Sequence, residues 1–274
     1  MKPFLAVLAA LVTTATGYTP FTPPYPPQII KSSQSRRTFI ELASATVFAA
    51  TLVAPKAASA SDDSIIPVYF GAGCFWHVQH EFVEAEIKFL KRSEKQLTAR
   101  AGYAGGTKLG KDGRVCYHNL GGKDEYGKMG HCEVVGLSIP KSSFADFCRV
   151  YFALYDKKGN RPDQLGDRGG EYRSIVGFPG GASNVELTNI VKDVSAEFGG
   201  VVKVVEGKAQ GGDDDLRGGT YVMNNENFPF HLGELYHQFH DGFAPGENYP
   251  ASYNNIKNNL NEAGLLDDTA CPLM

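Results

Sequence analysis

The sequence predicts a sheet with helices packed against it, a fold of the α/β or α+β class. Short runs rich in β-branched and aromatic residues alternate along the chain with longer runs that suit a helix. The glycine-rich segments between them lack the spacing and context of a dinucleotide or phosphate loop, so we interpret them as turns. No repeat or change of composition divides the region after residue 60. Its roughly 214 residues are enough for one domain with a substantial core.

The expected strands are short, and the first, an Ile-Ile-Pro-Val-Tyr-Phe run, is the most strand-like. We expect strands at 65–70, 96–101, 132–139, 172–177 and 201–205, with a shorter one at 221–223. The longer runs of mixed polar and apolar residues between them predict helices. We expect helices at 74–90, 141–155, 184–197 and 230–239.

The first 60 residues are predicted to be a targeting leader in two parts, separate from the fold. Residues 1–17 combine one lysine, an apolar run and a small-residue end, as in a secretory signal, and the proline-rich stretch within 18–34 indicates an extended linker. Residues 35–60 carry Arg36 and Arg37 before an apolar core and an Ala-Ser-Ala end, a pattern typical of a twin-arginine export signal. The alternative is one amphipathic helix that contains two arginines.

Two export signals in tandem indicate delivery to the thylakoid lumen of a complex plastid, with a secretory or periplasmic location as the alternative. The leader contains five of the 27 basic and one of the 30 acidic residues, so the remainder has 22 basic and 29 acidic side chains and a charge of about −7. This acidic balance argues against nucleic acid and anionic membrane surfaces as partners of the mature domain.

A Gly-Cys-Phe-Trp run at the end of the first predicted strand is the best candidate for chemistry. Cys74 stands where that strand meets a predicted helix, and free N–H groups at a helix start stabilise a thiolate, so we expect a lowered pKa. Phe75 and Trp76, the only tryptophan, add two apolar faces beside the thiol. A thiolate beside two aromatic rings is suited to attack a small, weakly polar group such as a thioether derivative. The alternative is a buried cysteine in a tight turn.

Three further motifs contain polar side chains that suit a reactive site. Tyr103 stands among glycines, and Glu133 lies in a predicted strand on the face opposite its two neighbours. A carboxyl in a partly apolar setting has a raised pKa and can act as a general acid near neutral pH. Asp167 and Tyr172 lie five residues apart in a glycine-rich loop. Taken singly, each has an ordinary structural explanation: packing for the tyrosines, a surface charge for Glu133, a turn for Asp167.

In this order the motifs resemble the methionine sulfoxide reductase A family, over most of the region from residue 71 to about 243. The segments that carry the resemblance are Gly-Cys-Phe-Trp at 73–76, Gly-Tyr-Ala-Gly-Gly at 102–106, 130–135, 166–174 and 230–239. The resemblance implies a compact α+β domain with a mixed sheet, flanking helices and a ferredoxin-like core. It also implies reduction of the S epimer of methionine sulfoxide, in proteins or as the free amino acid, and thus protein repair under oxidative stress.

The resemblance and the chemistry agree on the roles at the reacting sulfur. Cys74 is expected to attack the sulfoxide sulfur and become a sulfenic acid, and Glu133 is expected to protonate the departing oxygen. Tyr103 and Tyr172 donate hydrogen bonds to that oxygen, and Asp167 orients a water or a tyrosine.

The substrate's ε-methyl is expected to pack on Phe75 and Trp76. No cofactor is expected, and no metal either, because the histidines do not follow a metal-binding motif.

A sulfenic acid needs a second thiol, and here the sequence departs from the family pattern. We expect Cys271, in the C-terminal tail, to be the resolving cysteine, with Cys132 next and an external thiol as the remaining route. Cys116 matches a family position without a catalytic role, and Cys148 is expected to pack in the core. The expected partners are thioredoxin or another dithiol reductant and oxidised proteins, and a monomer is expected.

The sequence leaves two other function classes open. One is a cysteine hydrolase, which needs a histidine beside Cys74. The other is a non-catalytic module that binds methionine sulfoxide. Two segments also depart from the family pattern: 108–129 is longer than expected, and 207–219 is a predicted surface insertion.

Overall fold

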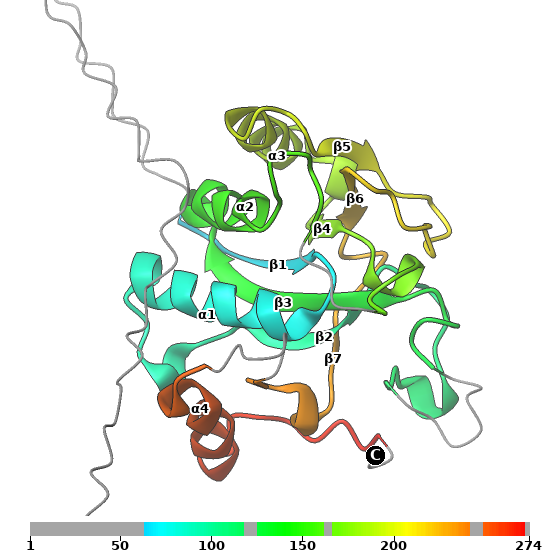
Figure 1. Cartoon of the computed structure of the whole chain (residues 1–274). Coiled ribbons are helices and arrows are strands. Elements are labelled where there is room, and N and C mark those ends of the chain that lie inside the picture. The colour runs from blue at the N-terminus through cyan, green and yellow to red at the C-terminus, as the bar shows by residue number, and fades with distance from the viewer. Residues whose placement is uncertain (1–62, 118–124, 162–165, 242–248, 272–274) are drawn as a thin grey trace, which may run out of the picture. The chain divides into compact units, whose positions relative to one another are not determined.

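The structure is built on one mixed sheet of seven strands (Figure 1). This computed structural model describes residues 63–117, 125–161, 166–241 and 249–271. The strand order is β5-β6-β4-β1-β3-β2-β7. The strands are β1 Ile65–Gly71, β2 Arg100–Ala104, β3 Cys132–Pro140, β4 Ile175–Phe178, β5 Lys203–Glu206, β6 Gly219–Asn224 and β7 His231–Leu232.

The centre of the sheet has the ferredoxin-like arrangement. The chain runs β1, α1 (Phe75–Leu90), β2, β3, α2 (Phe144–Ala153), β4, and these four strands lie in the antiparallel order β4-β1-β3-β2. Strand β6 adds to β4 in parallel and β5 to β6, while the two-residue β7 adds to β2. The expected α+β fold with a ferredoxin-like core is therefore confirmed.

The two faces of the sheet carry different cores. Alternate side chains of the strands, such as Val68 and Phe70, pack with residues of α1, α2, α3 (Val185–Glu197) and α4 (Ala251–Glu262) in one large cluster. Figure 1 shows α1 and α2 over this side of the sheet. The intervening side chains, including Tyr69, form a smaller cluster that contains no helical residue. Because β3 contributes to both clusters, its successive residues face different environments.

Near the C-terminus the structure differs from the sequence prediction. The expected helix at 230–239 is wrong: the segment forms β7 and a short 3-10 turn, Leu235–His237. The exposed edge of β2 needs hydrogen-bonding partners, and the Gln238 amide also donates to Ala101 O at 2.8 Å. Helix α4 was not predicted. The expected strand at 96–101 begins later, at Arg100, because a 3-10 turn occupies Glu94–Gln96.

The predicted leader, residues 1–17, 18–34 and 35–60, lies outside the described residues. Within the part of the chain that the structure describes, no helix is both long enough and apolar enough to cross a membrane.

Candidate active site

Cys74 lies in the turn that joins β1 to α1. Gly73 has φ +76°, a conformation that favours glycine, and its N–H donates to Tyr172 O at 3.1 Å. Cys74 is the residue immediately before α1, and only 7% of its surface is exposed. The glycine turn therefore places the thiol at the helix start and fixes it against the loop that carries Tyr172.

The expected lowering of the Cys74 pKa is wrong. Burial raises the pKa of this thiol well above its ordinary value, and the charge of nearby Glu133 raises it further. The N–H groups of Trp76 and His77 lower the pKa, as a helix start should, and Asp167 raises it again. Desolvation outweighs the helix start here, so the thiol of the free protein is neutral at physiological pH.

Glu133 lies in β3 on the same face of the sheet as Cys74. Its Oε2 accepts the Phe75 N–H at 2.9 Å, and its Oε1 accepts the Tyr126 hydroxyl at 3.2 Å. The neighbouring Cys132 belongs to the cluster on the opposite face, as strand alternation predicted. Burial raises the pKa of Glu133 to about 8, with a further contribution from Asp167, while the Phe75 and Tyr126 hydrogen bonds lower it. The predicted raised pKa of this carboxyl is confirmed.

Tyr103 stands opposite Glu133 in the β2–β3 register. Its hydroxyl donates to Glu234 Oε2 at 2.6 Å, and the ring is fully buried beside that of Tyr126, with centroids 4.7 Å apart. In this structure the Tyr103 hydroxyl is therefore engaged by a carboxylate from the C-terminal part of the chain. That contact was not expected from the sequence, because Glu234 is 131 residues away.

Tyr172 and Asp167 lie in the loop before β4. Tyr172 ends a 3-10 turn, Gly170–Tyr172, is half-buried, and shares hydrogen bonds with the hydroxyls of Tyr117 and Tyr126. Asp167 is also half-buried, and its charge raises the pKa of both Cys74 and Glu133. The structure thus brings the loop to the same site as the thiol and the carboxyl.

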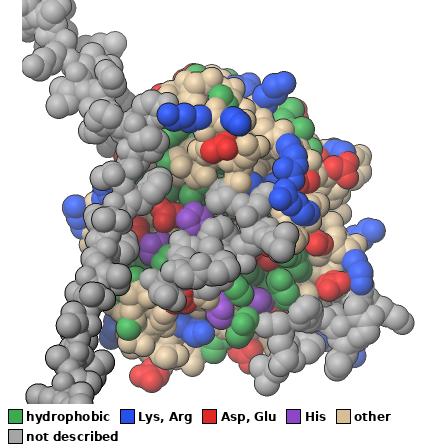
Figure 2. Space-filling view, in the orientation of Figure 1, with side chains coloured by type: hydrophobic (Ala, Val, Ile, Leu, Met, Phe, Trp, Pro, Cys, Tyr) green, Lys and Arg blue, Asp and Glu red, His purple; other side chains and the backbone are tan. Residues whose placement is uncertain are grey.

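Of the two aromatic residues predicted to contact the substrate, Phe75 is buried and Trp76 is partly exposed. Phe75 is buried, and its ring lies 6.5 Å from that of Trp76 and 5.1 Å from that of His237. Trp76 is half-buried and contacts His240, with ring centroids 3.9 Å apart. Histidine and hydrophobic side chains also lie close together on the face of the molecule seen in Figure 2.

Three residues of the site were missed in the sequence: Tyr117, Tyr126 and Glu234. Both tyrosines lie in the 108–129 segment, whose length was noted but which offered no periodic signal. The Tyr126 ring stacks on Tyr117 at 5.3 Å and on Tyr103 at 4.7 Å, so three tyrosine rings form a continuous stack beside Glu133. Glu234 accepts the Tyr117 N–H at 2.7 Å as well as the Tyr103 hydroxyl.

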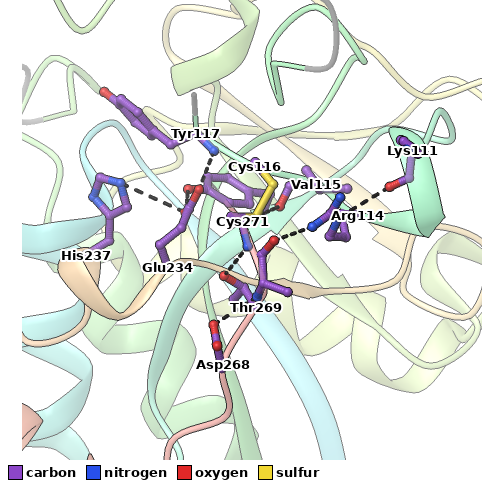
Figure 3. Close-up of a disulfide and its surroundings, with 12 residues drawn as sticks. Lys111, Arg114, Val115, Cys116, Tyr117, Glu234, His237, Asp268, Thr269 and Cys271 are labelled. Atoms are coloured by element: carbon purple, nitrogen blue, oxygen red, sulfur yellow. Dashed lines mark hydrogen bonds and ion pairs between the residues drawn. A yellow bond between two sulfur atoms is a disulfide. The ribbon is translucent and has the colours of Figure 1, made fainter. Parts of the chain in front are cut away.

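The five cysteines occupy different environments. Cys271 forms a disulfide with Cys116 (S–S 2.04 Å; Figure 3). The sequence had instead predicted that the Cys271 sulfur reacts with Cys74. Next to the disulfide, an Arg114 guanidinium N–H donates to Ala270 O. Cys74, Cys132 and Cys148 are free and buried. Burial raises the pKa of Cys132 to about 11, and this thiol lies across the sheet from Cys74.

Glu234 connects this disulfide to the tyrosine stack. One of its carboxylate oxygens and the two disulfide sulfurs lie within 4.8 Å of one another. The sulfurs are bonded to each other and the carboxylate holds two donors, so the group as it stands does not fit a metal. A hollow of about 420 Å³ between Tyr69, Arg100 and Phe230 lies on the face of the sheet away from Glu133, so we do not assign the site to it.

Comparison with known proteins gives a family. A family model described as peptide methionine sulfoxide reductase matches residues 67–210, more than half of the chain. Two curated proteins named peptide methionine sulfoxide reductase MsrA are similar. The protein of Geobacter metallireducens is 32% identical over 115 residues, 40% of this chain and 58% of that protein. The protein of Geobacter sulfurreducens is 32% identical over 113 residues, 39% of this chain and 57% of that protein. The chain thus spans a little over half the length of these relatives.

Among solved structures, reduced Mxr1 from Saccharomyces cerevisiae is 20% identical with a TM-score of 0.42, covering 68% of this chain and 91% of that one. Methionine sulfoxide reductase A of Corynebacterium diphtheriae is 19% identical with a TM-score of 0.39, covering 64% and 72%. The family match itself contains Cys74, Tyr103, Glu133, Asp167 and Tyr172. The chain therefore belongs to the peptide methionine sulfoxide reductase family.

Proposed function

We propose that this chain reduces the S epimer of methionine sulfoxide to methionine, in proteins or as the free amino acid. The observation that carries the proposal is the placement of a buried carboxyl, with a pKa of about 8, beside the Cys74 turn. Glu133 accepts the N–H of the residue next to Cys74, and it is mostly protonated at neutral pH. A candidate nucleophile and a candidate proton donor thus lie next to each other on one face of the sheet.

The reaction balances with these two groups alone. The Cys74 sulfur bonds to the sulfoxide sulfur while Glu133 protonates the oxygen, and the thiol proton returns to Glu133. The hydroxyl formed in this way then moves to the Cys74 sulfur as the S–S bond breaks, which releases methionine and leaves a sulfenic acid on Cys74. Two electrons pass from the cysteine sulfur to the sulfoxide sulfur. The raised pKa of Cys74 means that its proton must leave during this attack rather than before it.

The other predicted residues surround that event. Tyr172, half-buried and hydrogen-bonded to the hydroxyls of Tyr117 and Tyr126, donates to the developing oxygen charge. Tyr103 would take the same role once its hydroxyl leaves Glu234. Asp167 orients the loop hydroxyls.

Phe75 and Trp76 provide the apolar surface for the ε-methyl group. The partial exposure of Trp76 supports its role at the rim of the site.

We propose that Cys271 resolves the sulfenic acid and that Cys116 completes the exchange. The Cys271 thiol attacks the Cys74 sulfur, water leaves, and a mixed disulfide forms. The Cys116 thiol then attacks Cys271, which releases Cys74 as a thiol and leaves the Cys116–Cys271 disulfide seen here. Thioredoxin or another dithiol reduces that disulfide. The predicted leader would deliver this repair activity to the thylakoid lumen.

The cysteine hydrolase alternative has less support. It requires a histidine that activates Cys74, and the charged groups that act on this thiol are Glu133 and Asp167. A non-catalytic binding module is the outcome that would follow if the folded chain reduced neither epimer.

The test is turnover of separated S and R epimers of a blocked methionine sulfoxide by the full chain, with dithiothreitol. We expect the chain to consume the S epimer alone and to form methionine from it. Turnover of neither epimer by folded protein would overturn the proposal.

A further inference from the structure

Tyr126 comes from the 108–129 segment and faces Glu133 directly. Its hydroxyl lies 3.2 Å from Glu133 Oε1, and only 5% of its surface is exposed. The sequence assigned tyrosine chemistry at this site to Tyr103 and Tyr172, but the Tyr103 hydroxyl donates to Glu234 instead.

The backbone on both sides holds Tyr126 in this position. Its N–H donates to Cys116 O at 3.0 Å, and its carbonyl accepts the His131 N–H at 3.0 Å and the Met129 N–H at 3.2 Å. The ring is fixed between those of Tyr103 and Tyr117. A side chain held by main-chain bonds and by two stacked neighbours loses little further freedom when its hydroxyl binds the carboxyl.

We propose that Tyr126 is a positioning residue for Glu133: its hydroxyl orients the carboxyl and stabilises the carboxylate left after the proton has gone. The proposal rests on the proposed function for its consequence in turnover. The hydrogen bond to Oε1 and the Phe75 N–H on Oε2 hold the two carboxyl oxygens from opposite ends. Both donors strengthen when Glu133 becomes charged, because a hydrogen bond to a carboxylate is stronger than one to a neutral carboxyl.

Other titratable groups lie around Glu133. They are Asp167 and Glu171 from the loop before β4, Cys74 at the start of α1, and the hydroxyls of Tyr103, Tyr117, Tyr126 and Tyr172. The Glu133 charge raises the pKa of the Cys74 thiol and of these hydroxyls. Asp167 and Glu171 raise the pKa of Glu133, and Tyr126 lowers it. Removing the Tyr126 hydroxyl should therefore shift the Glu133 titration upward without removing a charge.

The test is an infrared titration of the full chain that needs no turnover. The protonated carboxyl band of Glu133 is identified by its absence in Glu133→Gln. In Tyr126→Phe we expect the midpoint to rise by ~1 pH unit, the size of one charge-assisted hydrogen bond. Two matched controls, Tyr103→Phe and Tyr117→Phe, keep the ring stack. The Tyr103 hydroxyl bonds to Glu234 and the Tyr117 hydroxyl to Tyr172, so these variants should leave the midpoint of the Glu133 titration unchanged.

Kinetics supply the second readout. In Tyr126→Phe we expect kcat for the S epimer to fall ~10-fold at neutral pH, with KM little changed and the alkaline limb of the profile displaced upward. A Tyr126→Phe protein that titrates and turns over like the wild type overturns the proposal. So does a Tyr103→Phe protein that shows the larger shift. If the infrared shift occurs but the wild-type chain does not reduce the sulfoxide, the proposed function fails while the hydrogen bond between Tyr126 and Glu133 stands.

Discussion

Cys74 and Cys132 are both buried thiols close to Glu133, but they lie on opposite faces of the same sheet. Cys74 shares its face with the Glu133 carboxyl, the aromatic pair and the tyrosine stack. Cys132, directly before Glu133 in the chain, packs among Tyr69 and other apolar residues in the second cluster. The period of two along β3 thus places Cys132 on the face of the sheet opposite to Glu133 and Cys74. Of these two thiols, only Cys74 has the surroundings that the proposed reaction needs.

The largest effect in this comparison should come from Cys74→Ser. We expect its turnover of the S epimer to fall at least ~10³-fold, because the hydroxyl is a much weaker nucleophile than sulfur. The measurement is methionine formation with dithiothreitol. Circular dichroism of the variant checks that the fold is intact, and substantial remaining turnover would remove Cys74 from its proposed role.

Glu133→Gln should have the next largest effect. The acid must be protonated to act, and its pKa is about 8, so wild-type kcat/KM should be constant below that pH and fall as pH rises through it. In Glu133→Gln we expect a loss of ~10²–10³-fold and disappearance of this alkaline limb. Glu171→Gln is the control. This exposed carboxyl raises the pKa of Glu133, so its removal should keep the alkaline limb and move it to lower pH. An unchanged alkaline limb in Glu133→Gln would assign the limb to another group.

Cys271→Ser separates chemistry from regeneration. A single turnover without reductant should proceed at the wild-type rate, whereas steady-state turnover with thioredoxin should fall ~10-fold or more. Cys116→Ser should share the steady-state loss and accumulate a Cys74–Cys271 disulfide, which peptide mapping detects. Normal thioredoxin-dependent turnover in both variants would make the disulfide purely structural.

The smallest effect should come from Cys132→Ala on the other face. Removal of the buried sulfur should lower the free energy of unfolding by ~1 kcal/mol, measured by urea denaturation. Turnover should stay within about twofold of the wild type, because the side chain has no route to the site. A loss comparable with that of Cys74→Ser would break the distinction between the two faces.

Sequence patterns within single segments correctly predicted those parts of the candidate site that one segment forms by itself. The strand–turn–helix around Cys74, the strand face of Glu133 and the loop of Tyr172 follow from glycines and alternation along short stretches. The lowered pKa of Cys74 was wrong, since burial of the thiol depends on segments distant in sequence.

The remaining features depend on long-range contacts or on weak signals. Tyr126 and Tyr117 lie in a segment without periodicity, and the Cys116–Cys271 pair spans 155 residues. Residues 230–239 pair with the β2 edge instead of forming a helix. Helix α4 did carry a signal, the apolar spacing of Tyr253, Ile256 and Leu260, but its many asparagines obscured it.

The most direct test of the account is to trap the sulfenic acid. The full chain with Cys116→Ser and Cys271→Ser is treated with one equivalent of the S epimer and dimedone, and the products are mapped by mass spectrometry. The account predicts one methionine released and one dimedone adduct, on Cys74, with none on Cys132. Release of methionine with the adduct on another cysteine, or no methionine from folded protein, would contradict it.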